Sequence, residues 1–454
     1  MLRLAFHDCL PYGEELGPGE ISGCDGCLNP TGMNMNLYQK YGGKGSKAAP
    51  DSVVLEGNNN GLTKVADLLE EVYTNPNFPN FWYVPKLTVS MKDSGKSRAD
   101  LWAFAGHFVY VTGVKRNNDA CNGVSAWRND TIRKLDADCL VTWPSIPAFK
   151  TGRKDCIPSP NALRPWHAPK HENHPSSFAN GPQTIEYFKK NFPSLNTREV
   201  IALTSGGHSM ARAHPDVSYF RYDWTQAQTH LFNNQMLRMI SNKPAYFGWY
   251  KWISGVRKLH LVGRFDGSIP PTKWVINKGA FTKSGGPAQW FFRYLRCPAT
   301  NDCATMTYDE VPPQNRFEPP TPKKCCENLE PNWKCHPDCE IWRQNDETAI
   351  SSDVGFYLKF KVDKATGEPY GCEGIEKPGY MPNGGHGGLI TCDKEDYAPD
   401  GEPLYAIVDD MADHQSSFMS SFVPAFQKMS ENGYSDLDLT IAPNNWFDYV
   451  LQNM

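Results

Sequence analysis

The chain has 454 residues, more than one compact unit usually holds, and 40% of them are hydrophobic, enough to fill a sizeable core. Its formal net charge of −4 gives no reason to expect a nucleic acid or an anionic membrane as partner. No run approaches the roughly 18–20 consecutive apolar residues that a membrane span requires. These features argue against a nucleic-acid-binding protein and a membrane-spanning protein. They indicate an ordinary globular chain of two or three compact units.

Apolar spacing predicts helices in the first half of the chain and again near its end. Leu62–Tyr73 has helical periodicity, and Ser97–Val111 begins with a serine suited to cap a helix. Thr197–Ala213 starts with a similar cap-like sequence and runs into Gly-Gly-His. Helical spacing returns in Leu404–Asn432. The sequence therefore predicts a mainly α protein.

The stretch from Ser241 to Gly388 differs from its surroundings, because it is rich in Trp, Pro, Gly and Cys. It contains short β-like runs such as Tyr357–Val362. A structureless loop of this length is implausible, so we expect a small core of its own. The predicted organisation is a helical domain interrupted by a cysteine-rich insertion, with boundaries at 1–240, 241–388 and 389–454.

The 14 cysteines favour disulfides and an oxidising compartment, because their number is even and their surroundings are rich in loops. A metal knuckle is the alternative for the cluster Cys325, Cys326, Cys335 and Cys339. The sequon at Asn129 is compatible with a secreted glycoprotein. No signal peptide is visible at Met1, so we expect an N-terminal part to have been removed. The predicted location is extracellular.

The opening residues LRLAFHDC place Arg3 and His7 one helical turn apart, on one face. Cleavage of a peroxide requires a base that moves a proton between the two oxygens and a cation that stabilises the departing one. A histidine and an arginine in this relation supply both. The alternative is a surface pair without function.

This opening resembles the distal-helix signature of the plant-type haem peroxidase superfamily, and EVIALTSGGH, which ends at His208, resembles its proximal motif. Shorter matches are NNGL at 59–62, RADL at 98–101 and GRKD at 152–155. The resemblance covers roughly residues 1–240 and 385–435. It implies the haem peroxidase fold, with haem b between a distal and a proximal helical half.

The resemblance also implies roles for single residues. His208 would be the axial ligand of the haem iron, and Asp393 would accept its other ring N–H. Asn59 would hold His7 in the correct tautomer, and Phe6 would pack over the haem. The alternatives are a turn or helix cap for Asp393 and a simple turn of asparagines around Asn59.

Three further residues match the intracellular branch of the superfamily. Trp224 falls where that branch has a tryptophan beneath the axial histidine, and there it could hold a radical. Arg212 and His214 match positions that contact a haem propionate. A core tryptophan and a pair of surface residues are the respective alternatives.

Calcium is a doubtful second cofactor. Asp8, Gly23 and Asp25 resemble distal calcium ligands of the secreted branches, but Cys27 replaces an expected serine, and thiols bind hard cations poorly. On the proximal side, Asn233 replaces the usual aspartate. We expect a disulfide knot around the CDGC sequence in place of the distal ion.

The predicted function is a secreted haem peroxidase that reduces hydrogen peroxide and oxidises phenolic or tyrosine donors, matrix proteins included, in one-electron steps. The alternative is a structural or matrix protein built on a peroxidase scaffold, with its function in the insertion. A catalase-like use is the third possibility, but the Met-Tyr-Trp arrangement that it requires cannot be identified. The physiological donor has no fixed sequence signature.

Overall fold

The computed structural model describes part of the chain, with only the backbone for several strands. The described residues are 1–10, 23–28, 59, 61–76, 89–123, 132–134, 137–144, 147–158, 160, 162–168, 175–211, 224–225, 230–241, 243, 246–253, 256–260, 273–277, 289–296, 334–335, 341–364, 367–373, 375–377, 389–435 and 437–442.

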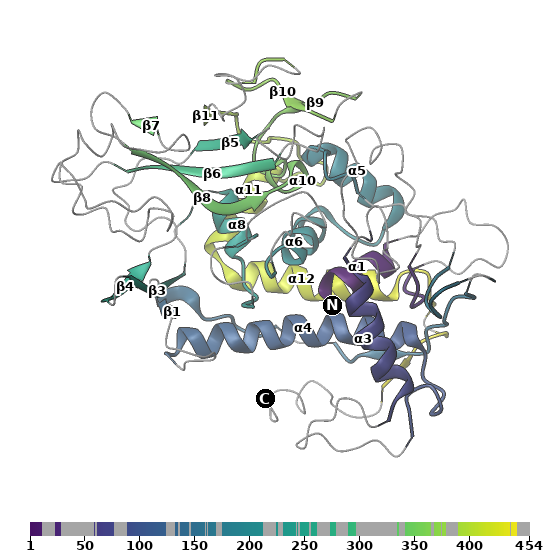
Figure 1. Ribbon diagram of the computed structural model, residues 1–454. Helices are drawn as coiled ribbons and strands as arrows, with labels where there is room; N and C mark the ends of the chain where they lie inside the picture. The colour runs from purple at the N-terminus through teal and green to yellow at the C-terminus, as the bar shows by residue number, and fades with distance from the viewer. Residues whose placement is uncertain are drawn as a thin grey trace.

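The protein is mainly α, as predicted; most of its helices pack around helix α12, and α3 packs against α4 in a second core cluster (Figure 1). In chain order they are α1 (Leu2–Cys9), α3 (Thr63–Thr74), α4 (Arg98–Cys121), the 3-10 helix η2 (Ala137–Cys139), α5 (Gly181–Asn191), α6 (Thr197–Gly207), α8 (Gln235–Ile240), α10 (Ser351–Val354), α11 (Leu404–Asp413) and α12 (Gln415–Glu431).

The predicted helices are present with altered ends. The Ser97 side chain caps α4 by accepting a hydrogen bond from the Asp100 N–H, and this helix continues to Cys121. The helix predicted over Thr197–Ala213 ends at Gly207. The stretch Leu404–Asn432 forms two helices, α11 and α12, that meet at the extended residue His414.

Aromatic side chains of α12 form the centre of the main core. Phe418, Phe422 and Phe426 follow one another along one face of this helix and are fully buried. Tyr110 of α4 packs edge-on against Phe422 at a ring-centroid distance of 5.3 Å. At Gly206 of α6 an added Cβ atom would lie 2.3 Å from the Phe422 ring. Glycine is therefore what lets α6 approach α12 so closely.

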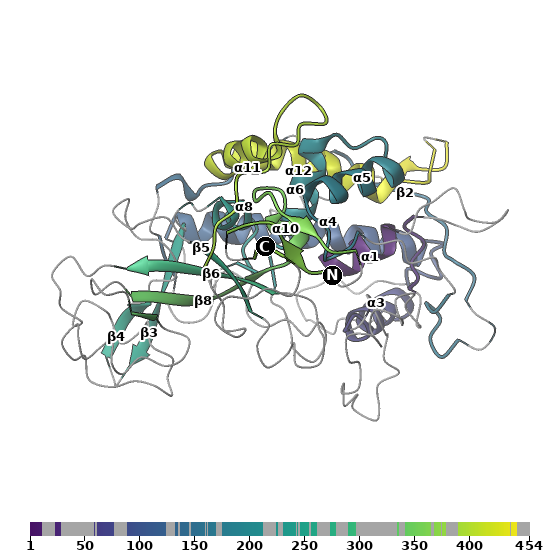
Figure 2. The same ribbon diagram turned by 90° about the horizontal axis from the view of Figure 1, so that it is seen from above.

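The strands form small antiparallel sheets, and the larger ones lie at the end of the molecule away from α3 (Figures 1 and 2). One sheet has five strands in the order β11-β5-β6-β8-β7: β11 (Leu389–Ile390), β5 (Lys273–Asn277), β6 (Gln289–Arg296), β8 (Ile341–Ala349) and β7 (Lys334–Cys335). A second has the order β1-β3-β4: β1 (Ile132–Lys134), β3 (Phe247–Ile253) and β4 (Val256–His260). Two pairs complete the set: β9 (Lys361–Val362) with β10 (Pro369–Tyr370), and β2 (Lys150–Thr151) with β12 (Thr440–Ile441).

The sheets lie largely in the predicted insertion, but its end belongs to the main core. Val354, Phe356 and Phe360 are buried in the same cluster as α6 and α12. The β-like run predicted at Tyr357–Val362 is a strand only at Lys361–Val362. The predicted boundary at residue 388 therefore falls after the point where the chain has returned to the helical core.

Candidate active site

Helix α1 presents one accessible face that carries Arg3, Phe6 and His7. Leu4 and Ala5, on its other side, are fully buried. At Gly106 of α4 an added Cβ atom would lie 2.8 Å from the Cβ atom of Ala5, so this glycine allows α1 to lie directly on α4. The packing fixes the direction in which the accessible face points.

A buried asparagine orients the distal histidine. The side-chain oxygen Oδ1 of Asn59 lies 3.0 Å from Nδ1 of His7, and Asn59 is only 1% exposed. An amide oxygen can only accept, so Nδ1 carries the proton and Nε2 keeps its lone pair. The structure thus brings together the predicted pair Asn59 and His7, with His7 in the tautomer of a base.

The guanidinium group of Arg3 lies beside Nε2 of His7, the nitrogen that can act as a base. Its Nε atom donates to Nε2 of His7 at 3.4 Å. The side chain is accessible to solvent, yet enough protein surrounds it that burial lowers its pKa to about 10. The guanidinium remains charged at neutral pH.

The proximal histidine follows a firmly anchored helix. The Asn196 side chain accepts from the Glu199 N–H, and Glu199 accepts in return from the Asn196 N–H, which forms a capping box for α6. Lys428 of α12 also bonds Glu199, at 2.7 Å. His208 is the residue immediately after this helix, at its C-terminal end.

Two side chains hold the His208 ring. Its Nδ1 atom lies 2.8 Å from Oδ1 of Asp353, a residue that is 3% exposed. The other oxygen of Asp353 accepts from the Ile350 N–H at 3.0 Å. Trp224 stacks on the imidazole with a centroid distance of 4.1 Å and an interplanar angle of 8°. The predicted neighbours His208 and Trp224 are therefore in contact.

The predicted carboxylate partner of His208, Asp393, was wrong. Asp393 is exposed, and its backbone oxygen accepts from the Lys359 N–H at 2.8 Å. This bond pairs the segment around Asp393 with the segment that follows Asp353, so the two aspartates lie on neighbouring stretches of chain. The sequence held no signal that singles out Asp353, because buried residues stand near both aspartates.

Two of the predicted residues, Arg212 and His214, lie outside the described residues. Phe6 is partly buried and packs against the main core. Its role beside a haem stays a prediction.

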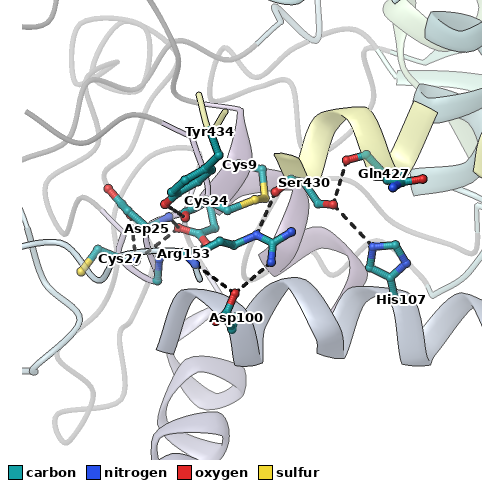
Figure 3. The surroundings of a disulfide bond; sticks show 12 residues. Cys9, Cys24, Asp25, Cys27, Asp100, His107, Arg153, Gln427, Ser430 and Tyr434 are labelled. Atoms are coloured by element: carbon teal, nitrogen blue, oxygen red, sulfur yellow. Dashed lines mark hydrogen bonds and ion pairs between the residues drawn. A yellow bond between two sulfur atoms is a disulfide. The ribbon is translucent and has the colours of Figure 1, made fainter. Parts of the chain in front are cut away.

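The segment for which a disulfide knot is predicted in place of a distal calcium ion is held by disulfides and hydrogen bonds (Figure 3). Disulfides join Cys9 to Cys24 and Cys27 to Cys156. The buried carboxylate of Asp8 accepts from the N–H groups of Asp25, Gly26 and Cys27, at 3.1–3.3 Å. The N–H groups that point at Asp8 would repel a cation, so this network is suited to tie the segment without an ion.

Two further contacts concern the segments considered for calcium. The Tyr434 hydroxyl, from the segment after α12, donates to the Cys24 carbonyl at 2.7 Å. On the proximal side, the amide oxygen of Asn233 accepts from the Gln235 N–H, and its nitrogen donates to Asn117.

Two more disulfides link Cys121 to Cys139 and Cys372 to Cys392, so four pairs are formed among the described residues. The four cysteines considered for a metal knuckle and the sequon at Asn129 have no described side chains. Among the helices that the structure describes, none is both long enough and apolar enough to cross a membrane.

The chain belongs to the peroxidase family: the family model Peroxidase matches residues 1–244, more than half of the 454 residues. It is thus an oxidoreductase of the peroxidase type, a class that takes a peroxide and a reducing donor. No individual curated protein matches the chain.

Proposed function

We propose that this protein is a haem-dependent peroxidase that reduces hydrogen peroxide and oxidises phenolic donors in one-electron steps outside the cell. The observation that carries the proposal is the pair of oriented histidines. His7 is held through Nδ1 by Asn59, and His208 is held through Nδ1 by Asp353. In each ring these bonds engage Nδ1, so Nε2 is the nitrogen that we assign to the chemistry; in His7 it also accepts from Arg3.

The residues present fit a haem. His208 offers one nitrogen to iron from a partly accessible ring, and its side chain is 28% exposed. When bound, haem b would supply the iron that binds peroxide and stores its two oxidising equivalents. Asp353 draws the Nδ1 proton of His208 toward itself, which makes the ring a more basic ligand.

The distal residues would move the proton. Nε2 of His7 would take a proton from one oxygen of the peroxide and return it to the other, which would leave as water. Arg3, beside Nε2, stabilises the negative charge that develops on the leaving oxygen. Asn59 keeps the ring in the tautomer that makes this possible. Trp224, stacked on His208, is the side chain best placed to supply an electron.

The four disulfides support an extracellular location, because such bonds persist in oxidising compartments. Phenolic donors, including tyrosine on matrix proteins, are the donor class that we propose for an enzyme in that location.

The test is the absorbance spectrum of the purified protein before and after one equivalent of hydrogen peroxide. We expect a Soret band that shifts within seconds, and a shift slower by about 10²–10⁴-fold in His7→Ala. His414→Ala is the control, because this histidine is 65% exposed at the start of α12. A protein that takes up no haem, even when haem is supplied, would instead be a structural protein on a peroxidase scaffold.

A further inference from the structure

A surface cavity of about 550 Å³ lies beside the start of α5, where Asn180 and Pro182 form part of its wall. The disulfide between Cys372 and Cys392 forms another part, because both cysteines line the cavity. Cys372 is 6% exposed, whereas Cys392 is partly exposed. A small thiol that enters the cavity can therefore approach this disulfide, and Cys392 is the more accessible of the two residues.

The accessibility of this disulfide exceeds that of most others that the structure describes. In two of the other three, both cysteines are buried, namely Cys9–Cys24 and Cys121–Cys139. In the third, Cys27 is fully buried and Cys156 is partly exposed. A thiol must reach a sulfur atom in order to attack it, so access controls the rate of exchange. Among these four disulfides, the one that lines the cavity is expected to exchange first.

A carbonyl group stands ready for the thiol that exchange would release. The Sγ atom of Cys372 lies 3.3 Å from the backbone oxygen of Lys359. In the disulfide this sulfur carries no hydrogen, but as a free thiol its S–H group could donate to that oxygen. Cys372 is therefore suited to be the sulfur that leaves, and the more exposed Cys392 the sulfur that is attacked.

The charged side chains of the cavity favour a cationic thiol. Lys359 forms an ion pair with Asp396 at 2.6 Å, which offsets the charge of that lysine. Lys361 is the second lysine of the lining, and the acidic residues of the lining are Glu373, Asp393 and Glu395. Glu373 and Asp393 are both exposed, so the accessible wall is negative in sum. Solvent screens exposed charges, so the attraction for a cation is modest.

Backbone hydrogen bonds would hold the neighbouring segments together after the disulfide opens. Glu373 and Thr391, each next to one of the cysteines, exchange two N–H to carbonyl bonds of 3.1 Å. On the far side of Cys392, the Lys359 N–H donates to the Asp393 carbonyl at 2.8 Å. Opening of the disulfide should therefore leave the fold in place, so that the exchange can run in both directions.

We propose that Cys372–Cys392 is a site of thiol–disulfide exchange, at which a small, positively charged aminothiol enters the cavity and modifies Cys392. This inference is independent of the proposed haem peroxidase function, because no step of the exchange involves haem or peroxide.

The exchange takes two steps. The thiolate of the aminothiol forms a bond to Sγ of Cys392 while the Cys372–Cys392 bond breaks, and the electron pair of that bond goes to Cys372, which takes a proton from water. A second aminothiol then attacks the sulfur of the first and displaces Cys392, which is protonated in turn. The two aminothiols leave as their own disulfide, and the two cysteines have gained the two electrons that the aminothiols lost.

The first test incubates the folded full chain with cysteamine, blocks free thiols with N-ethylmaleimide and identifies the modified peptides by mass spectrometry. We expect cysteamine on Cys392 and N-ethylmaleimide on Cys372 before either appears on the Cys9–Cys24 pair. That pair is the control within the same molecule, because both of its cysteines are fully buried. Equal or earlier labelling of Cys9 and Cys24, or cysteamine on Cys372 instead of Cys392, would overturn the proposal.

Circular dichroism of the same sample tests whether the exchange occurs in the folded protein. The helical signal should persist while the adduct forms, and addition of cystamine, the disulfide of cysteamine, should restore the Cys372–Cys392 bond. A helical signal that falls in step with the adduct would show that the labelling reports unfolding, and it would contradict the proposal.

A second test compares cysteamine with 2-mercaptoethanesulfonate, an anionic thiol with the same two-carbon chain. At low salt, and per thiolate, cysteamine should modify Cys392 about 2- to 5-fold faster, and added salt should narrow the difference. The preference should disappear in the double variant Glu373→Gln/Asp393→Asn. Glu71→Gln is the matched control, because this exposed carboxylate lies on α3. Equal rates for the two thiols at low salt would overturn the preference for a cation.

Discussion

His208 forms a hydrogen bond with Asp353, which lies 145 residues later in the chain, at a distance of 2.8 Å. The motif that precedes His208 is contiguous in the sequence. The carboxylate partner of His208, in contrast, follows most of the strands of the larger sheets in the chain. The proximal half of the site is therefore assembled from one segment before most strands of the larger sheets and one after them.

This pairing predicts different effects for two aspartates. Asp353→Asn should raise the reduction potential of the bound iron and slow the reaction with peroxide by about 10- to 100-fold, because the His208 ring becomes a weaker base. Asp393→Asn should leave the reduction potential and the rate of reaction with peroxide unchanged, since Asp393 is exposed. Redox titration and stopped-flow absorbance measure the two quantities. Equal effects of the two variants would contradict the assignment.

Two adjacent glycines should respond oppositely to alanine. In Gly206→Ala the new methyl group would lie 2.3 Å from the Phe422 ring, so we expect a loss of about 1–3 kcal/mol in the free energy of unfolding. At Gly207 an added Cβ atom meets no atom within 4 Å, and the free energy should stay the same or rise slightly. Denaturant titration of both variants tests this. A stable Gly206→Ala protein would show that α6 can move away from α12.

A buried histidine should make the protein sensitive to acid. Burial, followed by the charge of Arg153, lowers the pKa of His107 from its ordinary value of 6.5 to about 3. Between these values the unfolded chain binds a proton that the folded protein does not, so the free energy of unfolding falls as the pH falls. The slope from this one group approaches about 1.4 kcal/mol per pH unit.

The variant His107→Gln should lose that contribution to the slope between pH 6 and pH 4, whatever its stability at neutral pH. His414→Gln serves as the control, because that side chain is 65% exposed. Denaturant titrations at several pH values give the slopes. Parallel curves for His107→Gln and the parent protein would mean that His107 is protonated in the folded state.

The network around Asp8 predicts how the distal segment is held. A calcium chelator should leave the unfolding temperature unchanged, whereas a reductant should lower it, because loss of a native disulfide typically costs about 2–5 kcal/mol. Asp8→Asn should destabilise the protein by about 1.5–3 kcal/mol through its three backbone hydrogen bonds. A fall in unfolding temperature on chelation, reversed by added calcium, would show that an ion is bound.

The sequence predicted the parts of the site that depend on local spacing. Arg3 and His7 share a face because they are one turn apart on a helix, and the helices around Ser97 and Glu199 begin where their caps stand. Asn59 was identified by its motif, and the structure confirms its contact with His7.

The partner of His208 could not be found in this way, because its identity depends on how two distant segments pair. Asp353 and Asp393 both stand near buried residues, and it is the hydrogen bonds between their two segments, such as that from the Lys359 N–H to the Asp393 carbonyl, that show them to lie on neighbouring stretches of chain. The hydrogen bonds of Asp8 to backbone N–H groups could not be predicted either, because a sequence shows which carboxylates are present but not which groups they contact.

The disulfide Cys372–Cys392 joins the segment that follows Asp353 to the segment that leads into α11. Because Asp353, the carboxylate that bonds His208, lies between residues 241 and 388, this cysteine-rich stretch cannot be deleted as an independent unit. Such a deletion would remove Asp353 together with the sheets. A minimal version of the enzyme would have to rejoin the chain before Ile350, whose N–H fixes that carboxylate, and retain everything beyond it.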